Sequence, residues 1–188
     1  MTTSGPGTVL IFVGLPYTGK TTIIRGLLER TGGREIIADQ IYLSEVSPSD
    51  VGLSHWLAYA PKLAKRIVEK ASASDASVLC VELGIMPRKE RSSLIDWFRD
   101  RGDRVVPFWL KCDDPEVLAE RSALRAREKD ARAHKDGDAK INISPGGIYQ
   151  EIRKAFEEPE DVDGYETVST DARDAESIVT LVAGMAGL

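Results

Sequence analysis

The chain has 188 residues, of which 42% are hydrophobic and 29% charged, and its formal net charge is −5. This composition is typical of a globular protein with one domain and a sizeable core. The acidic balance argues against a wide basic surface for long nucleic acid, although it leaves a local basic patch open. No apolar run is long enough to cross a bilayer, and no secretion signal is visible in the first seven residues, so a cytoplasmic protein is expected.

Short apolar runs rich in β-branched residues alternate with longer amphipathic segments along the chain. The runs predict strands at residues 8–13, 35–38, 78–82, 105–111 and 166–169. The longer segments predict helices at residues 19–30, 50–71, 87–101, 113–132, 144–158 and 175–186. Pro61 falls inside the second helix and is expected to kink it or divide it in two. Strands that alternate with helices predict an α/β fold, with helices on both faces of a parallel sheet.

The first strand runs into a glycine-containing loop that opens the first helix. The loop reads Gly14-Leu15-Pro16-Tyr17-Thr18-Gly19-Lys20-Thr21-Thr22. This spacing between a strand and a helix is typical of a phosphate-binding loop, or P-loop, and a chance glycine-rich turn is the alternative. Its two glycines let backbone N–H groups turn toward a phosphate at the positive end of the helix.

The remaining side chains of this loop predict ATP and Mg²⁺ as ligands. Lys20 supplies a point charge for the terminal phosphates, and the Thr21 hydroxyl can bind Mg²⁺. The residues expected to bind the nucleotide within the loop are Gly14, Tyr17, Thr18, Gly19, Lys20, Thr21 and Thr22.

Two carboxylates stand at the ends of the next two strands. Asp39 follows the strand 35–38, and Glu82 ends the strand 78–82. Ligands of parallel sheets bind beyond the carboxyl ends of the strands, so both side chains are expected to face the P-loop. Asp39 can accept the proton of an attacking hydroxyl group, and Glu82 can hold Mg²⁺ or its water. The alternatives are a turn residue for Asp39 and a solvated strand end for Glu82.

A second group of residues is expected to meet the molecule that accepts the phosphoryl group. They are Asp39, Tyr42, Glu82 and Arg91. Arg91 lies in the first turns of the helix 87–101, where it could instead belong to a solvated helix face.

The helix that begins near residue 113 carries several arginines into a polar, glycine-punctuated stretch. They are Arg121, Arg125, Arg127 and Arg132. A basic helix next to such a stretch predicts a lid over residues 122–146, which could place guanidinium groups on transferring phosphoryl oxygens and exclude water. Arg125 is the first choice for this catalytic role. The alternative is a solubilising charged helix, since acidic residues are interspersed.

Together these segments resemble a family of enzymes. The P-loop and Asp39 are followed by Val78–Glu82, by Pro87–Arg91, by Val117–Arg121 with Arg125, and by Ala155–Pro159. The combination is similar to the single-domain P-loop kinases around the polynucleotide 5′-kinase domain, and more distantly to chloramphenicol phosphotransferase, gluconate kinase and zeta toxins.

The resemblance implies a three-layer fold of the nucleoside-monophosphate-kinase type, with a five-stranded parallel sheet and a helical lid over the single domain 1–188. It implies that Asp39 matches the family's catalytic aspartate, Arg125 a lid arginine, and Arg121 the arginine near the adenine. The acceptor half departs from the pattern. Tyr42 stands where polynucleotide-kinase-like members usually have an arginine, and Glu82 stands in place of the usual aspartate.

Three functions therefore stay open after the sequence has been read. The first is a kinase that transfers the γ-phosphoryl group of ATP to a hydroxyl of a small molecule, such as a sugar, a nucleoside or nucleotide, or an antibiotic-like metabolite. The second is a polynucleotide 5′-hydroxyl kinase, which the lost arginine and the acidic charge disfavour. The third is an ATP-binding regulatory module without phosphoryl transfer. The sequence does not decide whether the chain forms a homodimer, and no membrane partner is expected.

Overall fold

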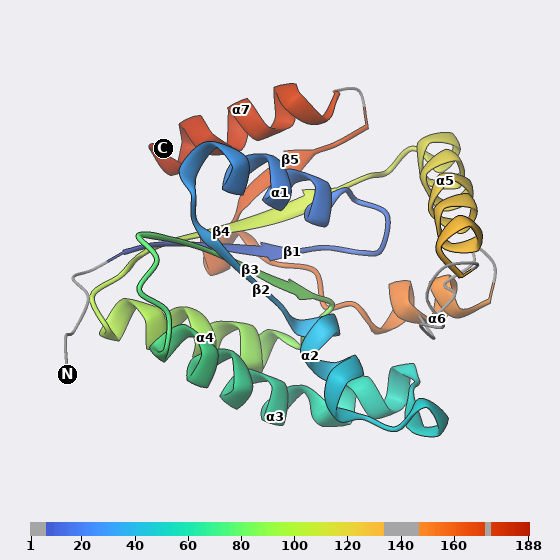
Figure 1. The fold of residues 1–188 in the computed structure, drawn as a ribbon, viewed down its shortest axis with the longest axis horizontal. Helices are drawn as coiled ribbons and strands as arrows, with labels where there is room; N and C mark the ends of the chain where they lie inside the picture. The colour runs from blue at the N-terminus through green and yellow to red at the C-terminus, as the bar shows by residue number, and fades with distance from the viewer. Residues whose placement is uncertain (1–6, 134–146, 172–173) are drawn as a thin grey trace.

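In a computed structural model the chain forms a parallel sheet between two layers of helices (Figure 1). The structure describes residues 7–133, 147–171 and 174–188. The strands are β1 (Thr8–Val13), β2 (Arg34–Ile37), β3 (Val78–Gly84), β4 (Arg104–Lys111) and β5 (Glu166–Ser169). The helices are α1 (Lys20–Thr31), α2 (Ala38–Glu45), α3 (Leu53–Ser72), α4 (Arg88–Asp100), α5 (Pro115–Ala133), α6 (Ile148–Ala155) and α7 (Ala175–Ala186). Two short 3₁₀ turns are Pro48–Asp50 and Asp161–Asp163.

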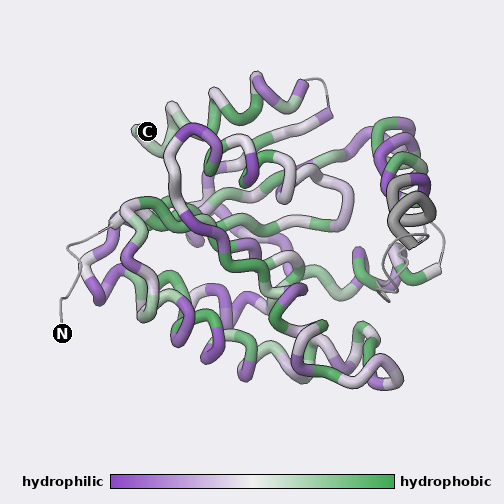
Figure 2. The backbone as a smooth tube through the Cα atoms, in the orientation of Figure 1, coloured by the Kyte–Doolittle hydropathy of each residue, from purple (hydrophilic) through white to green (hydrophobic). Residues whose placement is uncertain are grey.

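The five strands lie in the order β2-β3-β1-β4-β5, and every pair is parallel. The central strand β1 is buried on both faces, so its side chains divide between two cores. Val9, Ile11 and Val13 face the core under α3 and α4, whereas Leu10 and Phe12 face the core under α1 and α7. Figure 2 shows this as a hydrophobic sheet inside helices with hydrophilic outer turns. The sequence reads β1 as continuously apolar for this reason.

The predicted fold class is confirmed, and all five expected strands are present within about one or two residues of their expected ends. Two local features of the helices differ from what the sequence predicted. Residues 38–45 form α2, which the sequence analysis did not predict. Pro61 does not divide α3, which continues as one helix from Leu53 to Ser72. Its apolar side chains on both sides of Pro61 pack into the core, and this packing outweighs the lost hydrogen bond.

The expected helix 144–158 is confirmed only in part. Helix α6 ends at Ala155, and the expected start at Ser144-Pro145 lies outside the described residues. Most of the expected lid, residues 122–146, also lies outside the described residues. The part of it that the structure describes is the end of α5. None of the helices in the described ranges is both long enough and apolar enough to span a membrane.

Strand order brings three chain segments to one edge of the sheet. Glu82 of β3 pairs with Phe12 of β1 on one side and with Ile37 of β2 on the other. The P-loop leaves β1 just beyond Phe12, and α2 begins directly after Ile37. The sheet therefore places the P-loop, Glu82 and the first turn of α2 side by side.

Candidate active site

The P-loop begins with a backbone position that only glycine fits. Gly14 has a φ of 145°, and a Cβ atom there would lie 2.4 Å from the carbonyl oxygen of Leu110 on β4. The Gly14 N–H donates to the carbonyl oxygen of Gly84 at 3.1 Å, which ties the loop to the end of β3. The loop is therefore pressed between the two strands that flank β1.

The N-terminus of α1 has the properties of an anion site. Its N-cap, Gly19, has a left-handed conformation with a φ of 84°, and no side chain caps the helix. The first turn contains no acidic residue, so the N–H groups there face no carboxylate of their own turn. Together with the positive end of the helix dipole, this arrangement suits a phosphate group. Within the loop, Thr18 is buried and its hydroxyl donates to the carbonyl oxygen of Leu15, whereas Thr22 is exposed.

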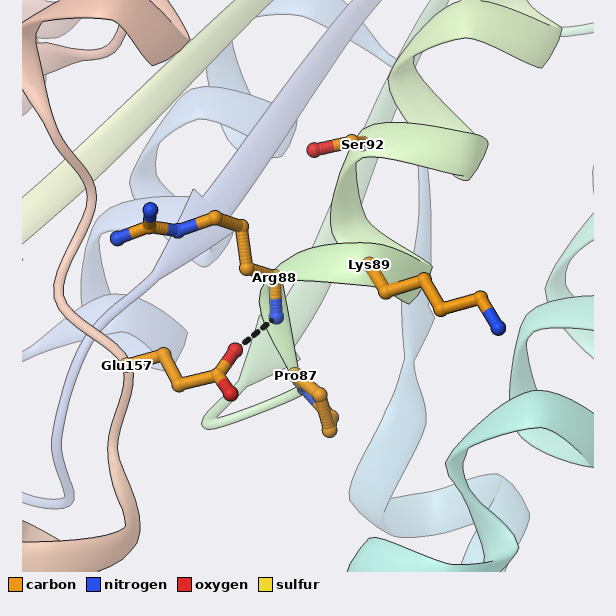
Figure 3. A pocket seen from close by; sticks show the side chains of 5 residues that line it. All are labelled: Pro87, Arg88, Lys89, Ser92 and Glu157. Carbon is orange, nitrogen blue, oxygen red and sulfur yellow. Dashed lines mark hydrogen bonds between the residues drawn. The ribbon is translucent and has the colours of Figure 1, made fainter.

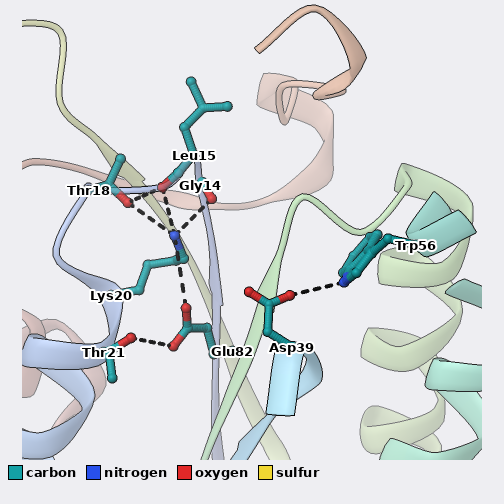
Figure 4. Close-up of polar contacts among 8 residues, drawn as sticks. All are labelled: Gly14, Leu15, Thr18, Lys20, Thr21, Asp39, Trp56 and Glu82. Atoms are coloured by element: carbon teal, nitrogen blue, oxygen red, sulfur yellow. Dashed lines mark hydrogen bonds and ion pairs between the residues drawn. The ribbon is translucent and has the colours of Figure 1, made fainter. Parts of the chain in front are cut away.

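The amine of Lys20 lies folded over the P-loop (Figure 4). Its Nζ donates to the carbonyl oxygens of Gly14 at 2.9 Å and Leu15 at 2.7 Å. Nζ also lies 4.0 Å from Oε1 of Glu82, and the side chain is only 7% exposed. Burial lowers the pKa of Lys20, and the carboxylates of Glu82 and Asp39 partly counter this. The two carboxylates only partly balance the positive charge of this buried amine. A bound anion would add the negative charge that is still missing.

Glu82 and Thr21 form a pair of oxygen donors beside the lysine. The Thr21 hydroxyl donates to Oε2 of Glu82 at 3.0 Å, and the two residues come from α1 and β3. Mg²⁺ is bound in proteins by one or two such hard oxygens, with the rest of its shell from water and phosphate. The chemistry of the pair fits Mg²⁺, and Thr21 and Glu82 are the residues that would hold it. Within the described ranges, no cluster of three His, Cys, Asp or Glu side chains offers another metal site.

Glu82 gives the free protein a specific pH dependence of stability. Burial raises the pKa of Glu82 above its ordinary value of 4.5, although Lys20 and Thr21 act in the other direction. The folded state thus holds this proton more tightly than the unfolded state. The stabilisation it gives is complete below pH 4.5 and is lost as the pH rises through the folded-state pKa.

Replacing Glu82 by glutamine, which does not ionise, is expected to remove the fall in stability that the ionisation of Glu82 causes. Urea unfolding between pH 5 and pH 8, without nucleotide, should show the free energy of unfolding of Glu82→Gln rising relative to wild type as the pH increases. The exposed Glu29 on α1 provides the matched control, Glu29→Gln, which should run parallel to wild type. A constant difference between wild type and Glu82→Gln over this range would contradict the burial argument.

Asp39 lies in the first turn of α2, on the far side of Glu82 from the P-loop (Figure 4). Its Oδ1 accepts a hydrogen bond of 3.0 Å from the indole Nε1 of Trp56 on α3. The other carboxylate oxygen points toward the side where Glu82 and Lys20 lie. Electrostatic interactions with both Lys20 and Glu82 place the Asp39 carboxylate in the same charged group.

Arg121 and Arg125 approach the P-loop from α5. Arg121 donates to the carbonyl oxygen of Tyr17 at 3.2 Å, to the hydroxyl of Thr170 at 2.9 Å and to its carbonyl oxygen at 2.6 Å. Arg121 thereby connects the loop to the segment after β5. The guanidinium carbon of Arg125 lies 5.9 Å from the centre of the Tyr17 ring, and its charge acts on Lys20 and Glu82. Arg125 is exposed, so it can move toward a bound phosphate.

Tyr17 is the only residue other than glycine with a positive φ in the described ranges, at 68°. Its ring also lies 6.1 Å from that of Tyr149 on α6. The tip of the loop thus meets α5 and α6.

Two residues expected to meet an acceptor, Tyr42 and Arg91, are buried in this structure. Tyr42 is 1% exposed, and its hydroxyl lies 2.9 Å from Nδ1 of His55. Arg91 is 1% exposed and donates to the carbonyl oxygen of Glu157 at 2.6 Å, with the Phe156 ring 5.6 Å away. The Tyr42 hydroxyl thus contacts His55 and the backbone at Gly52, and one guanidinium nitrogen of Arg91 is bound by the Glu157 carbonyl oxygen.

A surface cavity of about 560 Å³ lies at the start of α4, apart from the P-loop (Figure 3). It is lined by Pro87, Arg88, Lys89, Ser92 and Glu157. The carboxylate of Glu157 accepts from the backbone N–H of Arg88 at 2.5 Å and so covers the end of the helix. No residue of the P-loop, α2 or α3 lines this cavity.

Reading the sequence missed two partners within the site. One is Trp56, whose indole meets Asp39 across 17 residues of sequence. The other is Thr170, which meets Arg121 across 49 residues. The spacing of Ala38, Ile41 and Tyr42, which are all buried on one face of α2, could have revealed the helix that carries Asp39.

The fold is shared with known proteins. No curated protein is significantly similar in sequence to the chain. Among solved structures, a sugar kinase from Janibacter sp. HTCC2649 has a TM-score of 0.61 at 18% identity, over 95% of this chain and 94% of that one.

Two further structures of known kinases are similar in the same way. The APS kinase CysC of Mycobacterium tuberculosis, solved with AMPPNP and APS, has a TM-score of 0.60 at 12% identity over 97% of this chain and 99% of that one. Shikimate kinase from Acinetobacter baumannii, solved with shikimate, has a TM-score of 0.59 at 12% identity over 97% and 93%. At these identities the likeness is one of fold.

The family model described as an AAA domain matches residues 9–140, which include the P-loop, Asp39, Glu82 and the arginines of α5. The match covers more than half of the chain. This protein therefore belongs to that AAA-domain family of P-loop proteins.

Proposed function

We propose that the chain is an ATP-dependent kinase that transfers the γ-phosphoryl group of ATP to a hydroxyl group of a small molecule. The observation that carries this proposal is the gathering of Lys20, the Thr21–Glu82 pair and Asp39 at the carboxyl ends of three neighbouring strands. A module that only bound nucleotide would need no carboxylate on the far side of Glu82. The kinase folds of the similar structures support the same class of reaction.

In this proposal each group of the site has one task. The N–H groups of the P-loop and α1 bind the phosphates of ATP, and Lys20 leaves the loop carbonyls to bind the terminal phosphates. Asp39 accepts the proton of the acceptor hydroxyl as its oxygen forms a bond to the γ-phosphorus. The bond between that phosphorus and the bridging oxygen breaks, and ADP leaves. Arg125 approaches the transferring group from α5.

Thr21 and Glu82 would hold Mg²⁺, which supplies charge neutralisation between the β- and γ-phosphates when bound. Arg121 fixes the nucleotide side of the site by joining Tyr17 to Thr170. These roles make catalysis a matter of position and charge, as is usual for phosphoryl transfer.

The experiment is to incubate the protein with ATP and Mg²⁺ and measure ADP release against a panel of acceptors. The panel contains neutral sugars and polyols, hydroxy acids, nucleosides, nucleotides and a 5′-hydroxyl oligonucleotide. The proposal expects at least one small molecule to stimulate ADP release above the rate with water, with a new phosphate ester visible by ³¹P NMR. Stimulation by the oligonucleotide alone would favour a polynucleotide kinase. ATP binding with no stimulation by any acceptor would favour a regulatory module.

Replacing Lys20 by methionine is expected to lower kcat with the stimulating acceptor by about 10²-fold, because it removes one preorganised donor of the site. Methionine keeps about the length and volume of the buried lysine side chain, so the fold should be retained. The matched control is Arg25→Met, which removes an exposed cation from the same helix. Equal kcat values for Lys20→Met and Arg25→Met would contradict the role given to Lys20.

A further inference from the structure

The hydrogen bond between Asp39 and Trp56 joins two helices at the point where the proposed base stands. The indole Nε1 of Trp56 donates to Oδ1 of Asp39 at 3.0 Å. An indole N–H can only donate, and a carboxylate accepts it in a charge-assisted bond. Figure 4 shows one carboxylate oxygen held by the indole and the other directed toward the side of Glu82 and Lys20.

Trp56 is itself firmly placed. It is 6% exposed and belongs to the core under α3 and α4. Its backbone N–H donates to the carbonyl oxygen of Gly52 at 2.8 Å, which is the first hydrogen bond of α3. The indole therefore has little freedom to follow the carboxylate if that side chain turns away.

A second contact fixes the same two helices to each other. Tyr42 lies three residues after Asp39, on the same side of α2. The Gly52 N–H donates to the Tyr42 hydroxyl at 3.4 Å, and that hydroxyl lies 2.9 Å from Nδ1 of His55. Asp39 and Tyr42 of α2 thus both contact the start of α3. These contacts and the packing of Trp56 in the core together fix the position of its indole.

We infer that Trp56 is a positioning residue, which holds the carboxylate of Asp39 in the orientation that accepts a proton from the acceptor hydroxyl. This inference rests on the proposed kinase function. With Oδ1 bound to the indole, Oδ2 is the oxygen presented to the acceptor. Because misplacement of a reacting group by about 1 Å can cost about 10²-fold in rate, a single hydrogen bond at this point affects turnover.

The test is the variant Trp56→Phe, which keeps an aromatic ring in the core and removes the N–H donor. It is expected to lower kcat for the stimulating acceptor by about 10- to 100-fold, with the KM for ATP changed less than about twofold. The matched control is Trp97→Phe on α4, where the ring packs on Phe98 and the guanidinium group of Arg101. Trp97→Phe is expected to keep the wild-type kcat.

A double-mutant cycle separates positioning from general damage to the fold. If Trp56 acts through Asp39, Trp56→Phe should change kcat less than about twofold when Asp39 is already asparagine. A purely structural effect would lower kcat by the same factor in both backgrounds and would overturn the inference. An unchanged kcat in Trp56→Phe, together with a large loss in Asp39→Asn, would also overturn it while leaving the kinase proposal intact.

Failure of the proposed function has a different signature, because no acceptor would then stimulate ADP release by the wild-type protein. A measurement on the unaltered Trp56 guards against a variant that does not fold. In ¹⁵N NMR of the full chain, the Trp56 indole N–H of wild type should exchange slowly with solvent, and slowly again in Asp39→Asn, whose amide oxygen still accepts. Asp39→Ala should expose it to rapid exchange. Equal exchange in wild type and Asp39→Ala would show that the indole is not bound to Asp39.

Discussion

Replacing Asp39 by asparagine is expected to lower kcat by about 10²- to 10⁴-fold, the range that a positioned general base contributes. Asparagine has the same shape, and its amide oxygen can still accept the Trp56 indole N–H, so the side chain keeps its place. What it loses is the ability to take the acceptor proton as the new bond to phosphorus forms. The KM for ATP should change little, since the P-loop and Lys20 are unaltered.

Steady-state kinetics with a stimulating acceptor measures this effect. The control is Asp96→Asn, an exposed carboxylate on the outer face of α4. Urea unfolding of both variants should give free energies within about 1 kcal/mol of wild type, as is usual for isosteric changes without a buried unpaired charge. Retention of the wild-type kcat by Asp39→Asn with every accepted substrate would show that Asp39 is not the base.

The second large effect is expected at Gly14. Alanine there would place its Cβ 2.4 Å from the carbonyl oxygen of Leu110 and 3.2 Å from the hydroxyl of Thr18, at a φ of 145° that a side chain rarely adopts. Backbone atoms of β4 cannot move aside without breaking the sheet. We therefore expect Gly14→Ala to lower the free energy of unfolding by about 2–5 kcal/mol, the sum of backbone strain and overpacking.

The same variant should also lose ATP binding, because a displaced loop no longer presents its N–H groups to phosphate. Urea unfolding measures the first effect and isothermal titration with ATP the second. Gly102→Ala is the matched control, since Gly102 also has a positive φ, 90°, but no atom lies within 4 Å of the added Cβ. It should cost about 1–2 kcal/mol from backbone strain and bind ATP normally. Equal losses in the two variants would show that the contact with Leu110 is unimportant.

These predictions divide the site into a nucleotide half and an acceptor half. The nucleotide half consists of the P-loop, the Thr21–Glu82 pair and the arginines of α5. The acceptor half consists of Asp39 and the helices α2 and α3. The buried charges of Lys20 and Glu82 lie where the two halves meet, and the free protein stabilises neither of them fully. A bound nucleotide with Mg²⁺ would relieve both, so ligand binding is expected to stabilise the fold.

The nucleotide half could be predicted from the sequence because its chemistry is local. Gly14, Gly19, Lys20 and Thr21 act through backbone conformation and helix geometry within a single strand–loop–helix segment. The parallel sheet was predictable for a similar reason, since apolar runs such as Val9–Val13 must be covered on both faces. The position of Glu82 near the end of β3 followed from the same pattern, although the strand continues to Gly84.

Only the tertiary structure shows what surrounds Asp39. Asp39 lies just beyond β2, as expected, but the sequence did not predict that it belongs to the first turn of α2, where Ala38, Ile41 and Tyr42 bury one face of the helix. Trp56 contacts Asp39 only because α3 packs beside α2. Arg91 points inward, where it donates to the carbonyl oxygen of Glu157 and lies near the Phe156 ring. Contacts of this kind join residues far apart in the chain. They depend on how helices pack together, and the local pattern of residues does not specify that packing.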